Sequence, residues 1–198
     1  MKYKAILFDL DGTLLDYEQE QYAAVNHDKK LFDLVNSTEV QGYETIGIPP
    51  PDSQEMKAAF HRAGVHQNPE LFLKNYFERL SLKGIPLTGA LEILNELQGK
   101  VKLAIVSNSP GEVQDPRLET AGLARFFKHR FYSRDIGIAK PDPAILHIAM
   151  EELQVTKEET LFIGDSTTSD QPAARAAGIE FFLFKGDFKD PQLQALLK

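Results

Sequence analysis

Short apolar runs alternate with amphipathic stretches over most of this chain. Three apolar runs, at 5–8, 103–106 and 161–163, each have the length of a strand and end in polar residues. Uninterrupted apolar runs of this kind are typical of parallel strands that are covered on both faces. Two further strands are predicted near 131–132 and at 181–184.

Helical spacing of apolar residues predicts helices over 91–97 and 145–153, in front of the second and third strands. Another helix is expected to start at Pro172, with Asp170 as its N-terminal cap and Gly178 as its C-terminal stop. Strands that alternate with helices in this way predict an α/β fold with a parallel sheet.

This alternation is lost between residues 17 and 83, where the pattern is mainly helical and is interrupted by three consecutive prolines at 49–51. We therefore expect a core formed by residues 1–16 and 84–198, with a helical insertion at 17–83. The insertion leaves the core after the first strand, which positions it to cover the ends of the strands. Its aromatic residues Tyr43 and Phe72 could face a substrate, although aromatic residues in a small helical unit more often form its core.

The amino-acid composition argues against several classes of site and partner. The 198 residues include no cysteine, which excludes disulfides, thiolate nucleophiles and zinc–thiolate sites. The formal net charge of −7 argues against a general affinity for nucleic acid or for an anionic membrane. No stretch approaches the roughly 20 apolar residues of a membrane span, and residues 1–11 lack a signal peptide's cleavage region, so we expect a cytoplasmic protein.

Polar side chains follow three of the predicted strands. In open parallel sheets, ligands bind outside the carboxyl ends of the strands. Here those ends supply Asp9, Asp11, Ser107, Asn108 and Asp165. Each residue alone could belong to an ordinary turn or loop. Together, three carboxylates at one edge favour a Mg²⁺ site, because hard divalent cations prefer oxygen ligands.

Lys140 precedes a Pro-Asp-Pro segment that restricts its backbone. Most lysines are solvated surface charges. A fixed lysine near three carboxylates would instead offset their repulsion and could reach a phosphate oxygen. The sequence has no phosphate-binding P-loop, no dinucleotide fingerprint and no serine-hydrolase elbow, and its histidines show no paired metal spacing.

The order of these segments resembles the haloacid dehalogenase-like hydrolase superfamily. Its four motifs correspond to Asp9-x-Asp11-Gly12-Thr13, Ser107-Asn108, Lys140-Pro141-Asp142-Pro143 and Gly164-Asp165 to Asp170. The resemblance implies a Rossmann-like core in which the helical insertion at 17–83 acts as a cap.

The same resemblance implies a role for each motif residue. Asp9 would be the nucleophile, and Asp11 would be the acid that protonates the leaving oxygen and then activates water. Mg²⁺ would be held by Asp9, the backbone carbonyl of Asp11, and Asp165. The residues implied to bind the substrate's phosphate are Thr13, Ser107, Asn108 and Lys140. Asp170 would be supporting.

The implied activity is hydrolysis of a small-molecule phosphomonoester, by a monomer or weak homodimer. Dehalogenases of the superfamily lack the second aspartate of the first motif, so Asp11 favours phosphoryl chemistry. Residues 107–123 look like the pyrimidine 5′-nucleotidase branch, although that branch commonly has Thr-Asn-Gly where this chain has Ser107-Asn108-Ser109. The alternatives are a sugar-phosphate phosphatase, a phosphoglucomutase-like phosphotransferase, and a non-catalytic receiver-like or binding module.

Overall fold

A single parallel β-sheet forms the centre of the protein. The computed structural model describes residues 2–198. Its five strands lie in the order β3-β2-β1-β4-β5, and every neighbouring pair is parallel. The strands are β1 (Ala5–Phe8), β2 (Lys102–Ser107), β3 (His129–Tyr132), β4 (Thr160–Gly164) and β5 (Glu180–Leu183). The predicted Rossmann-like α/β fold is confirmed, with all five strands at their predicted positions.

Helices cover both faces of this sheet. One face packs against α6 (Ala90–Leu97), α7 (Gly111–Thr120) and α11 (Pro191–Leu196), in a cluster that includes Phe8 and Ile105. The other face packs against α9 (Ala144–Leu153) and α10 (Asp170–Ala177), in a cluster that includes Leu7 and Phe162. Because successive residues of a strand point to opposite faces, burial on both faces explains why the strand sequences are apolar throughout.

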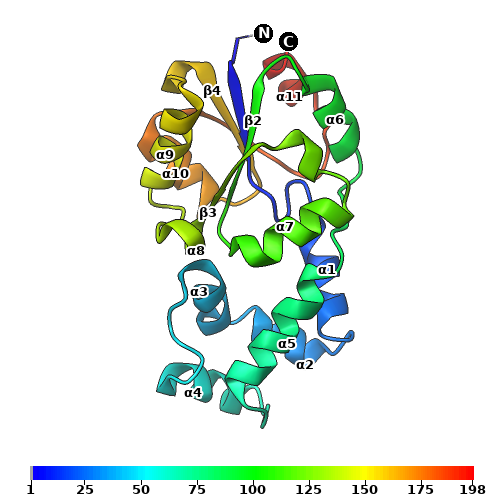
Figure 1. Ribbon diagram of the computed structural model, residues 1–198, viewed down its shortest axis with the longest axis vertical. Coiled ribbons are helices and arrows are strands. Elements are labelled where there is room, and N and C mark those ends of the chain that lie inside the picture. Colours follow the sequence, from blue (N-terminus) through cyan, green and yellow to red (C-terminus); the bar gives the residue numbers. More distant parts are fainter. Residues whose placement is uncertain (1) are drawn as a thin grey trace.

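Five helices form a second unit, here called the helical unit (residues 17–81). They are α1 (Tyr17–Ala24), α2 (Lys29–Val35), α3 (Thr38–Ile46), α4 (Gln54–Arg62) and α5 (Pro69–Ser81). Figure 1 shows the sheet and its helices in the upper half of the view and the helical unit in the lower half. The helical unit has its own hydrophobic cluster, to which α7 contributes Val113. Phe72 is buried in this cluster and Tyr43 packs against it.

Side-chain caps define several helix starts in the helical unit. Asp28, Ser37, Ser53 and Asn68 each accept a hydrogen bond from a backbone N–H in the first turn of α2, α3, α4 and α5, respectively. These bonds satisfy donors that the helix itself leaves free. The polar residues between the helices of this segment therefore have a local structural role.

The structure departs from the sequence-based expectations at two helices. Helix α7 was not predicted, because Gly111 and the internal Pro116 disfavour helix and the segment has little amphipathic character. Asp170 was expected to cap α10 but is its first residue, and its carboxylate accepts a hydrogen bond from Ser166 N at 3.0 Å instead. The remaining elements are the short α8 (Ser133–Ile136) and two 3₁₀ turns, Ala124–Phe126 and Lys157–Glu159. Within residues 2–198, none of the helices has the length and apolar character needed to cross a bilayer.

Candidate active site

The carboxyl ends of three neighbouring strands meet at the edge of the sheet that faces the helical unit (Figure 1). Asp9 directly follows β1, Ser107 ends β2 and Asp165 directly follows β4. A cavity of about 240 Å³ lies at this edge. Its lining residues are Asp9, Asp11, Tyr17, Gln41, Glu44, Thr45, Ser107, Asn108, Lys140, Asp165, Ser166, Ser169 and Asp170. The structure thus brings together seven of the eight predicted site residues around one cavity.

Lys140 is buried at the base of this cavity and contacts two carboxylates. Its Nζ lies 2.6 Å from Asp9 Oδ1 and 2.7 Å from Asp170 Oδ1, and it donates to the carbonyl oxygen of Val106 at 2.8 Å. Burial lowers the pKa of Lys140, but the charges of Asp9 and Asp170 outweigh burial and hold it above the ordinary lysine value. Lys140 is therefore a fixed cation beside Asp9.

Three carboxylates converge next to this lysine. Oxygen atoms of Asp9, Asp165 and Asp170 all lie within 4.8 Å of one another. Burial, together with the charges of Asp170 and Asp165, raises the pKa of Asp9 despite the opposing charge of Lys140. Burial and Asp170 also raise the pKa of Asp165. Such an all-oxygen cluster, with one exposed member, fits a hard divalent cation that keeps part of its hydration shell.

Gly12 lies in the loop after β1, at a position that requires a glycine. Its φ is +80°, and a Cβ placed there would come within 2.5 Å of Asp165 Oδ2. A side chain at this position would therefore push Asp165 away from the other carboxylates. Both the left-handed backbone and the close approach require glycine.

Thr13 lies beside the cavity, next to two of the carboxylates. It is fully buried and does not line the cavity. Its hydroxyl lies 3.3 Å from Asp9 Oδ2 and 3.5 Å from Asp165 Oδ1. In this structure the Thr13 hydroxyl is positioned to orient the two carboxylates, and its contact with a substrate's phosphate stays a prediction.

The side chain of Asn108 is hydrogen-bonded to the backbone of Lys140. Its Nδ2 donates to the carbonyl oxygen of Lys140 at 2.7 Å, and its Oδ1 accepts from Lys140 N at 2.9 Å. This reciprocal pair fixes the backbone of the lysine, and a contact between Asn108 and a phosphate stays a prediction. Ser107, by contrast, has its hydroxyl at the cavity, where it accepts a hydrogen bond from Gln114 Nε2 at 3.0 Å.

Asp11 belongs to a buried charge network that the sequence did not predict. Gln114 Nε2 donates to Asp11 Oδ2 at 2.6 Å, and Arg117 NH2 lies 2.7 Å from Asp11 Oδ1. Arg117 is fully buried and also pairs with the carboxylate of Glu20 from α1, to which its Nε donates at 2.6 Å. Gln114 and Arg117 are three residues apart, so a helix over 111–120 places them on one face; without that helix the sequence gives no signal for them.

The helical unit supplies a second set of residues that the sequence missed. Gln41, Glu44 and Thr45 of α3 line the cavity together with Tyr17. Glu44 is buried, and its Oε1 accepts hydrogen bonds from Tyr17 Oη at 2.6 Å and from Ser109 Oγ at 3.0 Å. Burial, with the nearby charge of Asp11, raises the pKa of Glu44 to about 7. No local motif marks these residues, because only the tertiary fold brings α3 to the strand ends.

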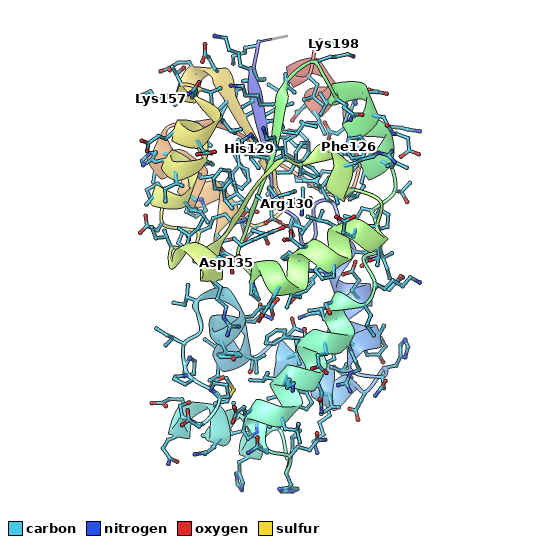
Figure 2. The ribbon with its side chains drawn as sticks, in the orientation of Figure 1. Phe126, His129, Arg130, Asp135, Lys157 and Lys198 are labelled. Atoms are coloured by element: carbon cyan, nitrogen blue, oxygen red, sulfur yellow. The ribbon has the colours of Figure 1, made fainter. Side chains whose placement is uncertain are left out.

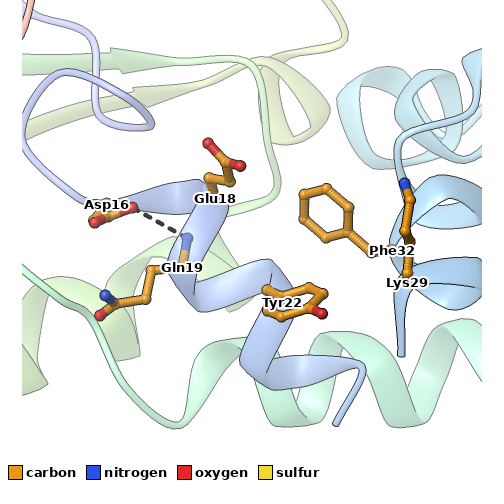
Figure 3. Close-up of a pocket in the computed structure, with 6 residues that line it drawn as sticks. All are labelled: Asp16, Glu18, Gln19, Tyr22, Lys29 and Phe32. Carbon is orange, nitrogen blue, oxygen red and sulfur yellow. Dashed lines mark hydrogen bonds between the residues drawn. The ribbon is translucent and has the colours of Figure 1, made fainter. Parts of the chain in front are cut away.

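A surface hollow and a loop contact lie outside this cavity. A wider surface hollow of about 430 Å³ lies between α1 and α2 and is lined by residues such as Glu18, Tyr22 and Phe32, none of which was predicted as a site residue (Figure 3). Asp135 lies at the lower end of the sheet half in Figure 2, and its Oδ1 accepts from Gly111 N at 3.3 Å. That bond ties α8 to the start of α7 next to the helical unit.

Several bacterial proteins are similar to this chain in sequence. The HAD-hydrolase YfnB of Bacillus subtilis is 29% identical over 210 residues, covering 95% of this chain and 86% of that protein. A phosphoglycolate phosphatase of Pseudomonas syringae pv. tomato is 32% identical over 186 residues, covering 89% of this chain and 67% of that protein. The pyrimidine 5′-nucleotidase PynA of Streptococcus pneumoniae is 27% identical, covering 98% of this chain and 89% of that protein.

Solved structures give the same picture of the fold. A crystal structure of Bacillus subtilis YfnB bound to magnesium has a TM-score of 0.81 at 25% identity, covering 98% of this chain and 92% of that one. The L-2-haloacid dehalogenase of Xanthobacter autotrophicus has a TM-score of 0.67 at 20% identity, covering 98% of this chain and 81% of that one, which is a likeness of fold alone. The family model of the haloacid dehalogenase-like hydrolases matches residues 6–184. The chain belongs to the haloacid dehalogenase-like hydrolase family, and it is a hydrolase with phosphatases and nucleotidases among its relatives.

Proposed function

We propose that this protein is a Mg²⁺-dependent phosphomonoesterase, which hydrolyses small phosphorylated metabolites through an aspartyl-phosphate on Asp9. The observation that carries the proposal is the position of Asp9 at the cavity, held 2.6 Å from Lys140 and with Asp11 lining the same cavity. A nucleophilic carboxylate, a second carboxylate for proton transfer and a fixed cation for phosphate oxygens are the groups that this chemistry needs.

Mg²⁺ would be held by the carboxylates of Asp9 and Asp165 and by the backbone carbonyl of Asp11. When bound, this ion neutralises part of the negative charge on the substrate's phosphate and so reduces its repulsion of Asp9. The carboxylate cluster supports this assignment, because its donors are all oxygen.

The proposed reaction has two displacements at phosphorus. In the first, an oxygen of Asp9 attacks the phosphorus, the bond to the leaving oxygen breaks, and Asp11 gives its proton to that oxygen. In the second, Asp11 removes a proton from water, the water oxygen attacks the phosphorus, and the bond to Asp9 breaks to release inorganic phosphate. Lys140 and the Ser107 hydroxyl would bind the transferring oxygens throughout.

Other residues keep the reacting groups in place. Gln114 and Arg117 hold the two oxygens of Asp11, and Asn108 holds the backbone of Lys140. Asp170 balances the charge of Lys140, and Thr13 orients Asp9. Asp11 also distinguishes the two chemistries of the superfamily, because cleavage of a carbon–halogen bond leaves a halide ion that needs no proton.

The helical unit, with its linkers at 17–83, would act as a cap that excludes water during phosphoryl transfer. We place the activity in the cytoplasm, in a monomer or weak homodimer. Nucleoside monophosphates are the first substrates to test, because PynA and the Escherichia coli nucleotidase YjjG are both similar to this chain. Sugar phosphates are the alternative, for a phosphatase or for a phosphoglucomutase-like transferase.

Phosphate release from a panel of substrates tests the proposal. Nucleoside monophosphates, sugar phosphates and a generic aryl phosphate are each incubated with the protein in Mg²⁺ and in EDTA. We expect release in Mg²⁺ only, and Mg²⁺ should also raise the melting temperature relative to EDTA because a ligand of the folded state stabilises it. Release that is unaffected by EDTA would contradict the metal assignment.

The Asp9→Asn variant tests the nucleophile. We expect it to fold like the parent and to lose release of phosphate from every substrate, because an amide oxygen is a poor nucleophile. The matched control is Asp187→Asn, which alters an exposed aspartate away from the cavity and should keep parental activity. Substantial activity in Asp9→Asn would rule out the aspartyl-phosphate mechanism.

A further inference from the structure

One wall of the cavity above Asp9 is formed by helix α3 of the helical unit. Gln41, Glu44 and Thr45 line the cavity from this side, opposite the residues that come from the strand ends. The phosphate must lie against Asp9 and Lys140, so the group attached to the phosphate extends toward the remaining walls. The side chains of α3 are therefore positioned to contact the leaving group.

Glu44 is the buried residue of this wall, and one of its two carboxylate oxygens is held by hydrogen bonds. Its Oε1 accepts from Tyr17 Oη and Ser109 Oγ, which fixes the side chain. Its Oε2 is buried and has no hydrogen-bond partner among residues 2–198. A buried oxygen without a partner is costly, and a donor from a bound molecule would relieve that cost.

The charged residues that line the cavity do not favour a second anionic group on the substrate, beyond its phosphate. Within residues 2–198, Lys140 is the one basic residue that lines the cavity, and that lysine already faces Asp9 and Asp170. The nearby guanidinium of Arg117 is committed to Asp11 and Glu20. Among the described residues that line the cavity, an anionic part of a substrate other than its phosphate would meet carboxylates and no uncommitted cation.

We propose that Glu44 selects substrates whose leaving group is neutral and donates a hydrogen bond, such as a sugar, polyol or nucleoside bearing hydroxyl or N–H groups. A leaving group that carries its own carboxylate, as in 2-phosphoglycolate, is disfavoured. Glu44's role rests on the proposed phosphatase activity and narrows its substrate class. The proposed selectivity favours a nucleotidase-like substrate over 2-phosphoglycolate. Phosphoglycolate phosphatases and pyrimidine 5′-nucleotidases both occur among the relatives.

The test compares kcat/KM for ribose 5-phosphate, uridine 5′-monophosphate, 2-phosphoglycolate and an aryl phosphate. The parent should prefer at least one of the two neutral-leaving-group substrates to 2-phosphoglycolate by about tenfold or more, the usual range for one hydrogen bond to a charged group. Glu44→Gln, which weakens the acceptor and removes the charge, should reduce that preference by about tenfold. The aryl phosphate, which offers no donor, should be hydrolysed similarly by both proteins.

Two further variants separate selectivity from damage to the fold. Glu44→Asp keeps the charge but draws it back by one methylene. The kcat/KM for the neutral substrates should therefore fall, while the kcat/KM for 2-phosphoglycolate stays low. Glu39→Gln alters the same helix outside the cavity, where Glu39 pairs with Arg62, and should behave like the parent. A melting temperature for each variant checks that it is folded.

The outcomes distinguish this inference from the proposed function. Equal use of 2-phosphoglycolate and the neutral substrates by the parent, or an unchanged preference in Glu44→Gln, would overturn the role of Glu44 while leaving the phosphatase intact. Absence of release from all four compounds would overturn both. If Glu44→Gln does not fold, the selectivity is tested by calorimetric binding to the inactive Asp9→Asn protein. The proposal then requires that 2-phosphoglycolate binds about tenfold more weakly than the better neutral substrate.

Discussion

Arg117 shows how a buried charge can serve a neighbouring site. Its side chain is fully buried, yet it contacts Asp11 and Glu20 and stacks 5.1 Å from the ring centre of Tyr17. Removing one member of such a network leaves an uncompensated charge inside the protein, which is strongly unfavourable. The cation therefore keeps the proposed proton-transfer residue in one orientation and joins it to the helical unit through Glu20.

Gln114 offers a milder test of this arrangement. The Gln114→Leu variant keeps a similar side-chain volume but loses the donor to Asp11 and Ser107 and the acceptor for Arg117, while Arg117 still lies beside Asp11. We expect kcat to fall about 10- to 100-fold, part of the effect that a well-placed general acid provides. Steady-state kinetics on the best substrate measures this.

The control for Gln114 is Gln19→Leu, an exposed position on α1 outside the cavity. It should retain parental kcat. A Gln114→Leu variant with normal kcat would show that Asp11 needs only Arg117 for its position.

At the residue scale, the sequence predicted the groups that follow strands and missed the groups that only tertiary folding brings near. Asp9 and Asp165 follow apolar runs, and this made their convergence predictable. Glu44 and Arg117 are distant from those runs in sequence and resemble ordinary surface charges. Thr13 and Asn108 were predicted to bind the phosphate, which stays a prediction. Their contacts with Asp9 and Lys140 could not be predicted, because they depend on rotamers that a sequence does not contain.

At the scale of elements, the loop that carries Lys140 is tied to the end of β2. The link is the reciprocal pair of hydrogen bonds between the side chain of Asn108 and the backbone of Lys140. In Asn108→Ala both bonds are lost, so the free energy of unfolding should fall by about 1–3 kcal/mol, and activity should fall because Lys140 loses its fixed position. Denaturant unfolding and phosphate release measure the two effects.

Asn95 of α6 provides the comparison. Its Nδ2 also donates to a backbone oxygen, that of Leu91, but on an exposed helix surface. Asn95→Ala should change stability by no more than about 0.5 kcal/mol and leave activity unchanged. If Asn108→Ala behaves in the same way, the pair does not position Lys140.

The elements differed in how far they could be predicted. Four strands were predicted to within one residue at each end, because burial on both faces leaves a continuous apolar signature. The fifth, β3, begins at His129, before its apolar residues Phe131 and Tyr132. Helix α7 gave no such signature, because its buried residues include Gln114 and Arg117 and it contains Pro116. A helix that buries polar groups for a site looks like a loop in a hydropathy pattern.

For the whole molecule, Glu44 links stability to pH. Burial raises its pKa from 4.5 to about 7 in the folded protein, where Tyr17 and Tyr76, Asp11 and Arg117 are the titratable or charged groups around it. A carboxyl with a raised pKa favours the folded state fully below its unfolded value, and this contribution is lost as the pH rises through the folded value. The carboxyl of Glu44 therefore destabilises the protein increasingly from about pH 4.5 to above pH 7.

The Glu44→Gln variant should reveal this contribution, because glutamine does not titrate. The free energy of unfolding of the parent minus that of Glu44→Gln should decrease by up to about 3 kcal/mol between pH 4.5 and pH 8. Denaturant titrations of both proteins at several pH values give this difference. A difference that is constant across the range, or that grows with pH, would contradict the raised pKa.

The contacts between the two halves of the molecule are unequal on their two sides. On one side, α5 packs on α7, Val113 joins the cluster of the helical unit, and both chain crossings lie nearby (Figure 1). On the other side, α3 meets the short α8 through a hydrogen bond from Ser133 Oγ to the carbonyl oxygen of Thr45. If the halves rotate about the packed side, α3 separates from α8 and from the strand ends. Such a rotation would separate Glu44 from Asp9 and Lys140, so the proposed contact between Glu44 and the leaving group would exist only when the two halves are closed.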